Sequence, residues 1–392
     1  MKKKFITIGV LIASFLMIAI NIITPKFCLA LSNSDDYSAK ALFLMDFNTN
    51  QVLFKKNSDT KIPVASIVKL MTIYLTCEEI NAGRLKLDDV VTVSENASSM
   101  GGSQVFIETN GEYSVGDLLK SCIVSSANDA SVALAETIAG NEENFVVLMN
   151  KTAQKLGMTN TNYVNCTGLP AGNQFSCAKD TAILLKEVLK NDIYHNYSTI
   201  WMDTLKHPKG RESELVNTNK LIRYYEGCDG GKTGSTSEAG YCLAATAKRN
   251  SMRLIAVVLG AENGKARFAE TSKLLNFGFA NFENKMIVDK NVVLTEKIKV
   301  KNGQKTEVNV KPQENLYIIA KKRENSDDIN TVVKINDTIS APVKVGEIVG
   351  TIYLTKNGEV VSQTNIVCTE NINKSSFYDN VNKTIQNWKV FN

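Results

Sequence analysis

The chain has 392 residues, of which 44% are hydrophobic and 22% charged, so it has enough apolar material for the core of a globular protein. Its length favours two or more domains. The formal net charge is +5, but residues 1–30 contain four lysines and no acidic residue, so subtracting four charges leaves +1 for the rest. A balance this close to neutral argues against nucleic acid as a partner.

The first thirty residues have the pattern of an export signal. Three lysines at residues 2–4 precede an uncharged apolar run over 5–23, and Cys28 and Ala30 place small residues before a cleavage site. The run is also close to the shortest length that spans a membrane, so an uncleaved anchor is the alternative. We expect a signal peptide over 1–30 and an exported protein that acts at the cell wall or the outer face of the cytoplasmic membrane.

The next part of the chain predicts two strands followed by several helices. Residues 40–58 have the pattern of two strands joined by a turn. Residues 66–83 have apolar side chains on nearly all faces of a helix, which predicts a buried one. Helical spacing returns over 117–156, with a break at residues 125–128, and again over 177–191.

The pattern changes to strands after residue 228. Three strand-like runs follow one another up to residue 261 and predict an antiparallel sheet, and residues 266–282 return to helical spacing. Strands at both ends with helices between them indicate an α+β domain. We place this domain at 31–285.

The remainder of the chain predicts a small all-β domain over 286–372. Its runs alternate or are rich in β-branched residues, and Asn302-Gly303 and Asn357-Gly358 are typical hairpin turns. Residues 373–392 then place apolar side chains at helical spacing. This last segment fits a helix on a membrane surface and equally a helix packed on the β-domain.

The cysteines give no sign of a metal site or a disulfide framework. There are eight, and seven remain after the expected cleavage, with no CxxC pair among them. We expect most of them to be buried free thiols. No metal and no organic cofactor is expected.

The stretch PVASIVKLMT, residues 63–72, places Ser66 three residues before Lys69, so both lie on one face of a helix. An ammonium in apolar surroundings loses hydration, which lowers its pKa. A neutral amine next to a serine hydroxyl can act as its general base. The alternative is a capping serine and a lysine that extends to solvent, and SxxK alone occurs often by chance.

Two further motifs strengthen the first one. Ser126-Ala127-Asn128 interrupts a helical pattern, and Lys232-Thr233-Gly234 stands at the start of a strand. SxxK, SxN and KTG in this order are the signature of penicillin-recognising serine acyl enzymes.

The chain resembles the low-molecular-mass penicillin-binding proteins that are D-alanyl-D-alanine carboxypeptidases, serine peptidase family S11. The segments SSANDASVALAE, LGMTNTNYVNCTGLP and DGGKTGSTSEAGYCLAATAKR are similar to family segments, and so is APVKVGEIVG in the β-domain. The resemblance covers nearly all of 36–370. It implies an α+β penicillin-binding-protein/β-lactamase-like serine acyl-enzyme domain followed by the small all-β domain.

The resemblance implies a role for each motif residue in hydrolysing the bond between the two D-alanines of a peptidoglycan stem peptide. Ser66 would be the nucleophile, Lys69 its base, and Ser126 a proton relay to the leaving amine. Substrate contacts would come from the following residues: Asn128, Lys232, Thr233, Gly234, Ser235 and Arg267. The backbone N–H groups of Ser66 and Ser235 would form the oxyanion hole, and Thr233 and Arg267 would hold the terminal carboxylate. β-Lactams would be covalent inhibitors.

Three other functions share part of this pattern. A class A β-lactamase adds a deacylating glutamate between the second and third motifs, but residues 160–180 contain none. A transpeptidase would use the same acyl-enzyme with an amine acceptor. A non-hydrolytic β-lactam sensor or wall-binding protein is the non-enzymatic alternative, although all three motifs are intact here.

Overall fold

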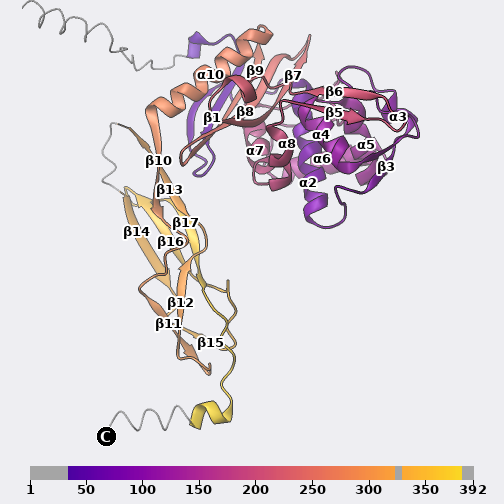
Figure 1. Ribbon diagram of the computed structural model, residues 1–392. Coiled ribbons are helices and arrows are strands. Elements are labelled where there is room, and N and C mark those ends of the chain that lie inside the picture. The colour runs from indigo at the N-terminus through magenta and orange to yellow at the C-terminus, as the bar shows by residue number, and fades with distance from the viewer. Residues whose placement is uncertain (1–33, 323–328, 382–392) are drawn as a thin grey trace, which may run out of the picture. The chain divides into compact units, whose positions relative to one another are not determined.

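A computed structural model describes residues 34–322 and 329–381 of the chain. The expected signal peptide and residues 382–392 of the C-terminal segment lie outside the described residues. A five-stranded antiparallel sheet forms the centre of the first domain (Figure 1). In spatial order its strands are β2 (Val52–Lys56), β1 (Ala41–Asp46), β9 (Met252–Ala261), β8 (Gly240–Arg249) and β7 (Cys228–Thr236).

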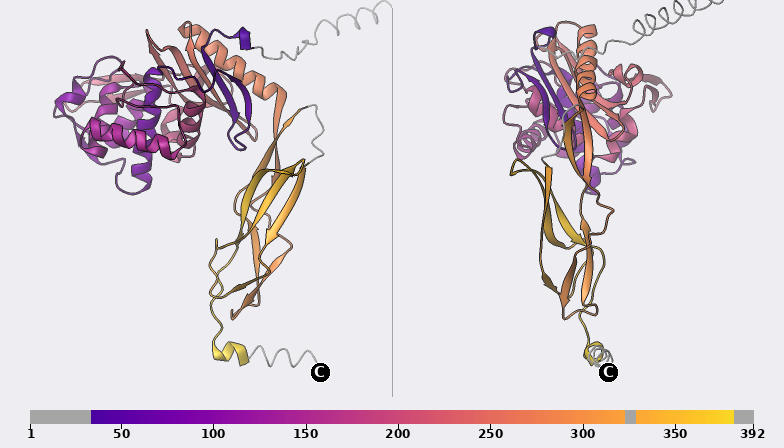
Figure 2. Two further views of the ribbon diagram at one scale, coloured as in Figure 1. Left: turned by 180° about the vertical axis from the view of Figure 1, so that it is seen from behind. Right: turned by 90° about the vertical axis from the view of Figure 1, so that its left-hand side faces the viewer.

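Both faces of this sheet are covered, because alternate residues of each strand point to opposite sides. On β1, Phe43 packs into the large cluster of the helical side, whereas Leu42 and Leu44 pack with Leu274 on the other side. That other side is covered by one helix, α10 (Gly264–Asn281), which lies along the sheet in both views of Figure 2. The sequence predicted this helix over 266–282, so the helix begins two residues earlier than predicted.

Helices cover the opposite side of the sheet, and the first two motifs lie among them. These helices are α2 (Lys69–Asn81), α4 (Val115–Val124), α5 (Asn128–Ala139), α6 (Glu142–Lys155), α7 (Ala178–Val188) and α8 (Asp192–Ser198). The predicted break at 125–128 separates α4 from α5. Cys177 at the N-cap of α7 and Asn141 at the N-cap of α6 accept backbone N–H bonds that start those helices.

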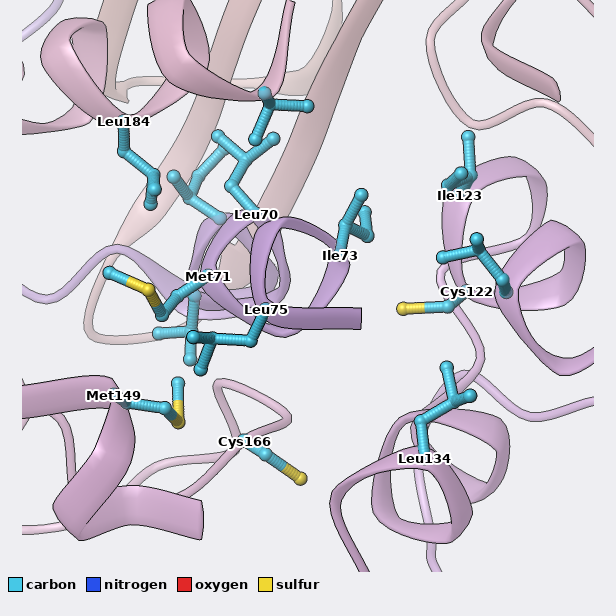
Figure 3. Packing of buried hydrophobic residues seen from close by; sticks show 14 of the residues in the cluster. Leu70, Met71, Ile73, Leu75, Cys122, Ile123, Leu134, Met149, Cys166 and Leu184 are labelled. Atoms are coloured by element: carbon cyan, nitrogen blue, oxygen red, sulfur yellow. The ribbon is translucent and has the colours of Figure 1, made fainter. Parts of the chain in front are cut away.

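Helix α2 is buried, as the sequence predicted, and it lies at the centre of the core. Leu70, Met71 and Ile73 are all fully buried, and Figure 3 shows α2 surrounded by side chains from α4, α5, α6 and α7. Burying a side chain of this size stabilises a fold by about 1.5–3 kcal/mol. The first motif is therefore anchored on a rigid element.

The first turn of the helix predicted over 66–83 is a separate 3-10 segment, η2 (Ala65–Val68). Short elements that the sequence did not predict complete this domain: η1 (Ser34–Asp36), β3 (Val90–Thr92), α3 (Glu95–Ser98), β4 (Glu112–Ser114), β5 (Met202–Lys206), β6 (Glu212–Val216) and α9 (Leu221–Tyr224). Strands β3 and β4 pair with each other, and β5 pairs with β6 as a hairpin.

The second domain is all-β, as predicted. A six-stranded sheet has the order β14-β16-β17-β12-β11-β15, and β10 pairs with β13. The strands are β10 (Phe282–Val288), β11 (Lys297–Lys301), β12 (Glu307–Pro312), β13 (Leu316–Lys321), β14 (Ile329–Ile335), β15 (Thr338–Ser340), β16 (Ile348–Lys356) and β17 (Glu359–Cys368). Asn357 and Gly358 both have positive φ and form the two-residue hairpin turn between β16 and β17.

The described residues contain seven cysteines, and all seven are buried and free. None of the helices in the described part of the chain is long and apolar enough to cross a membrane. A helical stretch covers 377–381, where Phe377 and Tyr378 are strongly exposed.

Candidate active site

Ser66 lies in the 3-10 segment η2, immediately before α2 begins at Lys69. Ala65 has a φ of +50°, an uncommon conformation for a residue with a Cβ, and it turns the chain sharply just before Ser66. The Lys69 amine donates to the Ser66 hydroxyl at 3.1 Å. Ser66 caps neither η2 nor α2, so the capping interpretation of this motif is excluded.

Lys69 is completely buried, so it does not extend to solvent. Besides Ser66, its amine donates to the side-chain oxygen of Asn128 and to the backbone carbonyl of Thr167. Burial lowers the pKa of Lys69 to about 8. A substantial fraction of this amine is therefore neutral near physiological pH and able to accept a proton.

The second and third motifs meet through one hydrogen bond. The Lys232 amine donates to the Ser126 hydroxyl at 2.6 Å and to the Thr233 carbonyl at 3.1 Å. Lys232 is 1% exposed, and burial together with the nearby Lys69 charge holds its pKa well below the ordinary value. Ser126 has a φ of +61°, as a residue of the break between α4 and α5.

Strand β7 lies against η2, and a glycine makes this possible. A Cβ at Gly234 would come within 2.7 Å of the Val64 carbonyl oxygen and 3.0 Å of the Ser66 nitrogen. Only a residue without a side chain fits this close approach without a shift. Ser235, the next residue, is exposed at the end of β7.

The two residues predicted to hold the terminal carboxylate, Thr233 and Arg267, lie on β7 and α10. Thr233 is buried, and its hydroxyl donates to the hydroxyl of Thr218 at 2.8 Å. Arg267 on α10 donates from Nη1 to the Gly234 carbonyl at 3.2 Å, and its Nε is buried without a hydrogen-bond partner among the described residues. Arg267 is therefore not the ordinary exposed arginine that a position at a helix start suggests.

Thr218 is a residue that the sequence analysis missed. Its backbone N–H donates to the carbonyl of Val124, close to Ser126, while its side chain pairs with Thr233. The flanking Asn217 donates to the Ser198 carbonyl at the end of α8, and Asn219 donates to the Gly230 carbonyl of β7. The only signal in the sequence was the polar Asn-Thr-Asn triplet, which is also typical of a loop.

A second missed feature is the turn at residues 165–169, which supplies the carbonyl that Lys69 contacts. The side-chain oxygen of Asn165 accepts from the backbone N–H groups of Thr167 and Gly168. Gly168 has a φ of +82°, and a Cβ there would lie 2.1 Å from the Ala65 carbonyl oxygen. This segment, where a class A β-lactamase has its glutamate, instead packs directly behind the nucleophile.

The loop before β4 is fixed to the second motif. Asn128 donates from its amide to the Gly101 carbonyl, and the buried carboxylate of Asp129 accepts from the backbone N–H groups of Val105 and Ile107. The amide of Asn128 is thus held between Lys69 and this loop in the free protein.

The two histidines have other partners. His207 bonds Tyr113 and Ser213, and His195 bonds the Leu189 carbonyl. None of these partners contacts Ser66. The described residues contain no group of acidic, histidine or cysteine side chains that could hold a metal ion.

Family models match both domains of the chain. Residues 30–263 match the model described as D-alanyl-D-alanine carboxypeptidase, peptidase S11. Residues 282–374 match the model described as the C-terminal domain of penicillin-binding protein 5.

Individual relatives are similar over nearly their whole length. The chain is 41% identical over 355 residues to the D-alanyl-D-alanine carboxypeptidase DacF of Bacillus subtilis, covering 91% of each. It is 36% identical to the D-alanyl-D-alanine carboxypeptidase DacC of Escherichia coli, over 88% of this chain and 86% of that one. Among solved structures, penicillin-binding protein 5 of Haemophilus influenzae matches with a TM-score of 0.69 at 32% identity, covering 86% of this chain and 98% of that chain.

Proposed function

The chain belongs to the D-alanyl-D-alanine carboxypeptidase family of serine peptidases, and from this premise we propose that it removes the terminal D-alanine of peptidoglycan stem peptides through an ester on Ser66. The observation that carries the proposal is the contact between the Ser66 hydroxyl and a completely buried lysine amine. Such a pair provides a nucleophile and its base without histidine.

The first chemical step is attack by Ser66 on the carbonyl of the penultimate D-alanine. Lys69, as a neutral amine, takes the hydroxyl proton. The backbone N–H groups of Ser66 and Ser235 stabilise the negative charge that develops on the carbonyl oxygen, and removing one such donor typically costs about 3–4 kcal/mol. Gly234 supports this role because it lets β7 approach Ser66 closely.

The second step is departure of the terminal D-alanine. Ser126 passes a proton to the leaving amine, and its contact with Lys232 orients the hydroxyl for this transfer. Burial and the nearby Lys69 charge hold the pKa of Lys232 well below its ordinary value in the free protein. A bound substrate carboxylate opposes this shift, because a nearby opposite charge stabilises an ammonium, and Lys232 then keeps the local field positive. Water then hydrolyses the Ser66 ester.

Recognition of the free carboxylate distinguishes an exopeptidase. Thr233, Thr218 and Arg267 form this site: two hydroxyls that already pair with each other and a guanidinium with an unpaired Nε. Charge-assisted hydrogen bonds hold a carboxylate well. Asn128 contacts the substrate backbone after its amide exchanges one of its present partners.

The pH dependence of acylation tests the role of Lys69. We expect kcat/KM for D-alanine release to rise with pH and to level off above about 8, because the pKa of Lys69 is lowered to about 8 and only the neutral amine is a base. The measurement is a rate profile between pH 5 and pH 10 at constant ionic strength. A profile that is flat across pH 7–9 would contradict this assignment.

Export and membrane association belong to the same proposal. Removal of residues 1–30 releases the protein outside the cytoplasm, where family substrates occur, and the segment 373–392 then lies on the membrane surface. The exposed rings of Phe377 and Tyr378 support this, since an interfacial helix needs apolar side chains facing outward. The β-domain, which we place at 286–372, separates this segment from the catalytic domain at 31–285.

Deleting the C-terminal segment tests the anchoring. We expect a chain that ends at residue 374 to move from the membrane fraction to the soluble fraction after processing, with unchanged D-alanine release from a soluble peptide. The measurement is fractionation followed by immunoblotting. If the shortened chain stays on membranes, the anchor is an uncleaved N-terminus instead.

Labelling with a fluorescent penicillin tests the proposed nucleophile. We expect one covalent label per chain, mapped to the peptide that contains Ser66, and none in Ser66→Ala. A label on another residue would refute the assignment. A label on Ser66 without any D-alanine release would favour a transpeptidase or a non-hydrolytic β-lactam sensor.

A further inference from the structure

The main chain at Cys166 is held by side chains of three helices, which the mechanism above does not use. The carbonyl of Cys166 accepts hydrogen bonds from the hydroxyls of Thr72 on α2 and Ser131 on α5, each at 2.9 Å. The N–H group of Cys166 donates to a carboxylate oxygen of Glu142 on α6, also at 2.9 Å. Both polar groups of this residue's main chain are therefore fixed by side chains from distant parts of the sequence.

These contacts lie in the core, next to the helix that follows the nucleophile. Thr72 and Ser131 are fully buried. Figure 3 shows Cys166 between α5, which carries Leu134, and α6, which carries Met149. A hydrogen bond is electrostatically stronger inside a protein than in water, and a buried polar group without a partner is costly. The main chain at Cys166 therefore has little freedom to move.

The next carbonyl along the chain is the one that contacts the catalytic lysine. The Thr167 carbonyl accepts from the Lys69 amine. Lys69 and Thr72 are three residues apart on α2, so one face of this helix contacts two successive carbonyls. The Cys166 carbonyl belongs to the planar peptide unit that also contains the nitrogen and Cα of Thr167. Fixing the first carbonyl therefore restricts where the second can lie.

The Thr167 carbonyl determines how the Lys69 amine faces Ser66. An ammonium has three N–H donors, and this one has three acceptors: the Ser66 hydroxyl, the Asn128 side-chain oxygen and the Thr167 carbonyl. The neutral amine has two N–H donors and one lone pair. Donation to Asn128 and Thr167 leaves the lone pair directed at the Ser66 hydroxyl, which is the geometry that a general base needs.

The direction of the Thr72 hydroxyl is unusual for a helix. A buried hydroxyl on a helix often bonds a carbonyl of its own helix, and Thr76 does so: its hydroxyl donates to the Thr72 carbonyl at 2.8 Å. The hydroxyls of Thr72 and Ser131 instead donate to a residue 94 and 35 positions away. Thr76 is fully buried on the same helix as Thr72, so it provides a matched control.

We propose that Thr72 and Ser131 are positioning residues for the acylation step. They hold the Thr167 carbonyl on the Lys69 amine, so that the lone pair of the neutral amine faces the nucleophile. The inference rests on the proposed function. Both residues act through the turn at 165–169, and the reaction itself is unchanged.

The test compares wild-type protein with Thr72→Val, Thr72→Ser, Thr76→Val and the double variant Thr72→Val/Ser131→Ala. Valine has the shape of threonine but no hydroxyl, whereas serine keeps the hydroxyl. The measurements are the pH profile of kcat/KM for D-alanine release and the rate of acylation by a fluorescent penicillin. Urea unfolding establishes that each variant is folded.

We expect the high-pH plateau of kcat/KM to fall about tenfold in Thr72→Val and about 10²-fold in the double variant, because a small misplacement of a reacting group has a cost of this order. Thr72→Ser and Thr76→Val should stay near the wild-type plateau. The midpoint of the profile should move to lower pH in Thr72→Val. A carbonyl that moves away no longer stabilises the Lys69 ammonium, and this lowers the pKa of the amine.

Three results would overturn the inference and leave the proposed function intact. One is a wild-type rate and midpoint in the folded double variant. Another is an equal loss in Thr76→Val, because core packing would then explain the effect. The third is a midpoint that moves to higher pH, which would show that water reaches Lys69. Absence of D-alanine release by wild-type protein would contradict the proposed function, and the penicillin acylation rates would then decide the inference by the same comparison.

Discussion

Replacing Lys69 with methionine should reduce D-alanine release and penicillin acylation by about 10²–10⁴-fold, the usual contribution of a general base. Methionine has a similar length and no amine, so Ser66 would keep its position but lose the group that accepts its proton. Because the side chain is fully buried, an apolar replacement should leave the chain folded. The measurements are steady-state release of D-alanine and the rate of labelling by a fluorescent penicillin.

Two controls separate this loss of the base from other effects. Lys69→Arg keeps a cation at the same place but cannot become neutral, so it should be as inactive as Lys69→Met. Lys151→Met changes an exposed lysine of α6 in the same way and should retain full activity. Activity in Lys69→Arg would show that the charge of Lys69 matters, and not its basicity.

Gly168→Ala should abolish activity and lower the free energy of unfolding by about 2–4 kcal/mol. Two costs add: an alanine at a φ of +82° is strained by about 1–2 kcal/mol, and its Cβ would lie 2.1 Å from the Ala65 carbonyl oxygen. The atoms that must shift are backbone atoms next to Ser66. A change of one methyl group therefore displaces the nucleophile. Urea unfolding and penicillin labelling measure the two effects.

Gly157→Ala is the matched control for this substitution. Gly157 also has a positive φ, of +75°, but a Cβ there would meet nothing within 4 Å. Its substitution should cost only the backbone strain of about 1–2 kcal/mol and leave penicillin labelling unchanged. Equal loss of labelling in both variants would show that the packing of Gly168 against Ala65 is not what positions Ser66.

Regular elements of this fold could be predicted from the sequence because their periodicity is strong. The apolar faces of α2 and the continuous apolar runs of β8 and β9 report burial directly, and Asn357-Gly358 identifies a hairpin through its backbone requirement. The short hairpin β5–β6 was missed, because its strands are mostly exposed and have no apolar pattern.

Residues of the candidate site could be predicted from the sequence only when they belong to a motif. Ser66, Lys69 and Lys232 were identified from spacing, and their roles stay predictions until they are measured. Thr218 and Gly168 could not be found this way, because their importance arises from contacts with residues distant in the chain: Thr218 with Thr233, and Gly168 with Ala65. Such contacts exist only after folding and leave no local pattern.

The most direct test of the account is release of D-alanine from a peptide that ends in D-Ala-D-Ala, comparing the wild-type protein with Ser66→Ala. The account predicts steady release by wild-type protein and none by the variant, with the same circular dichroism spectrum for both. Release that persists in Ser66→Ala would contradict an acyl-enzyme on this serine, and no release by folded wild-type protein would contradict the carboxypeptidase function itself.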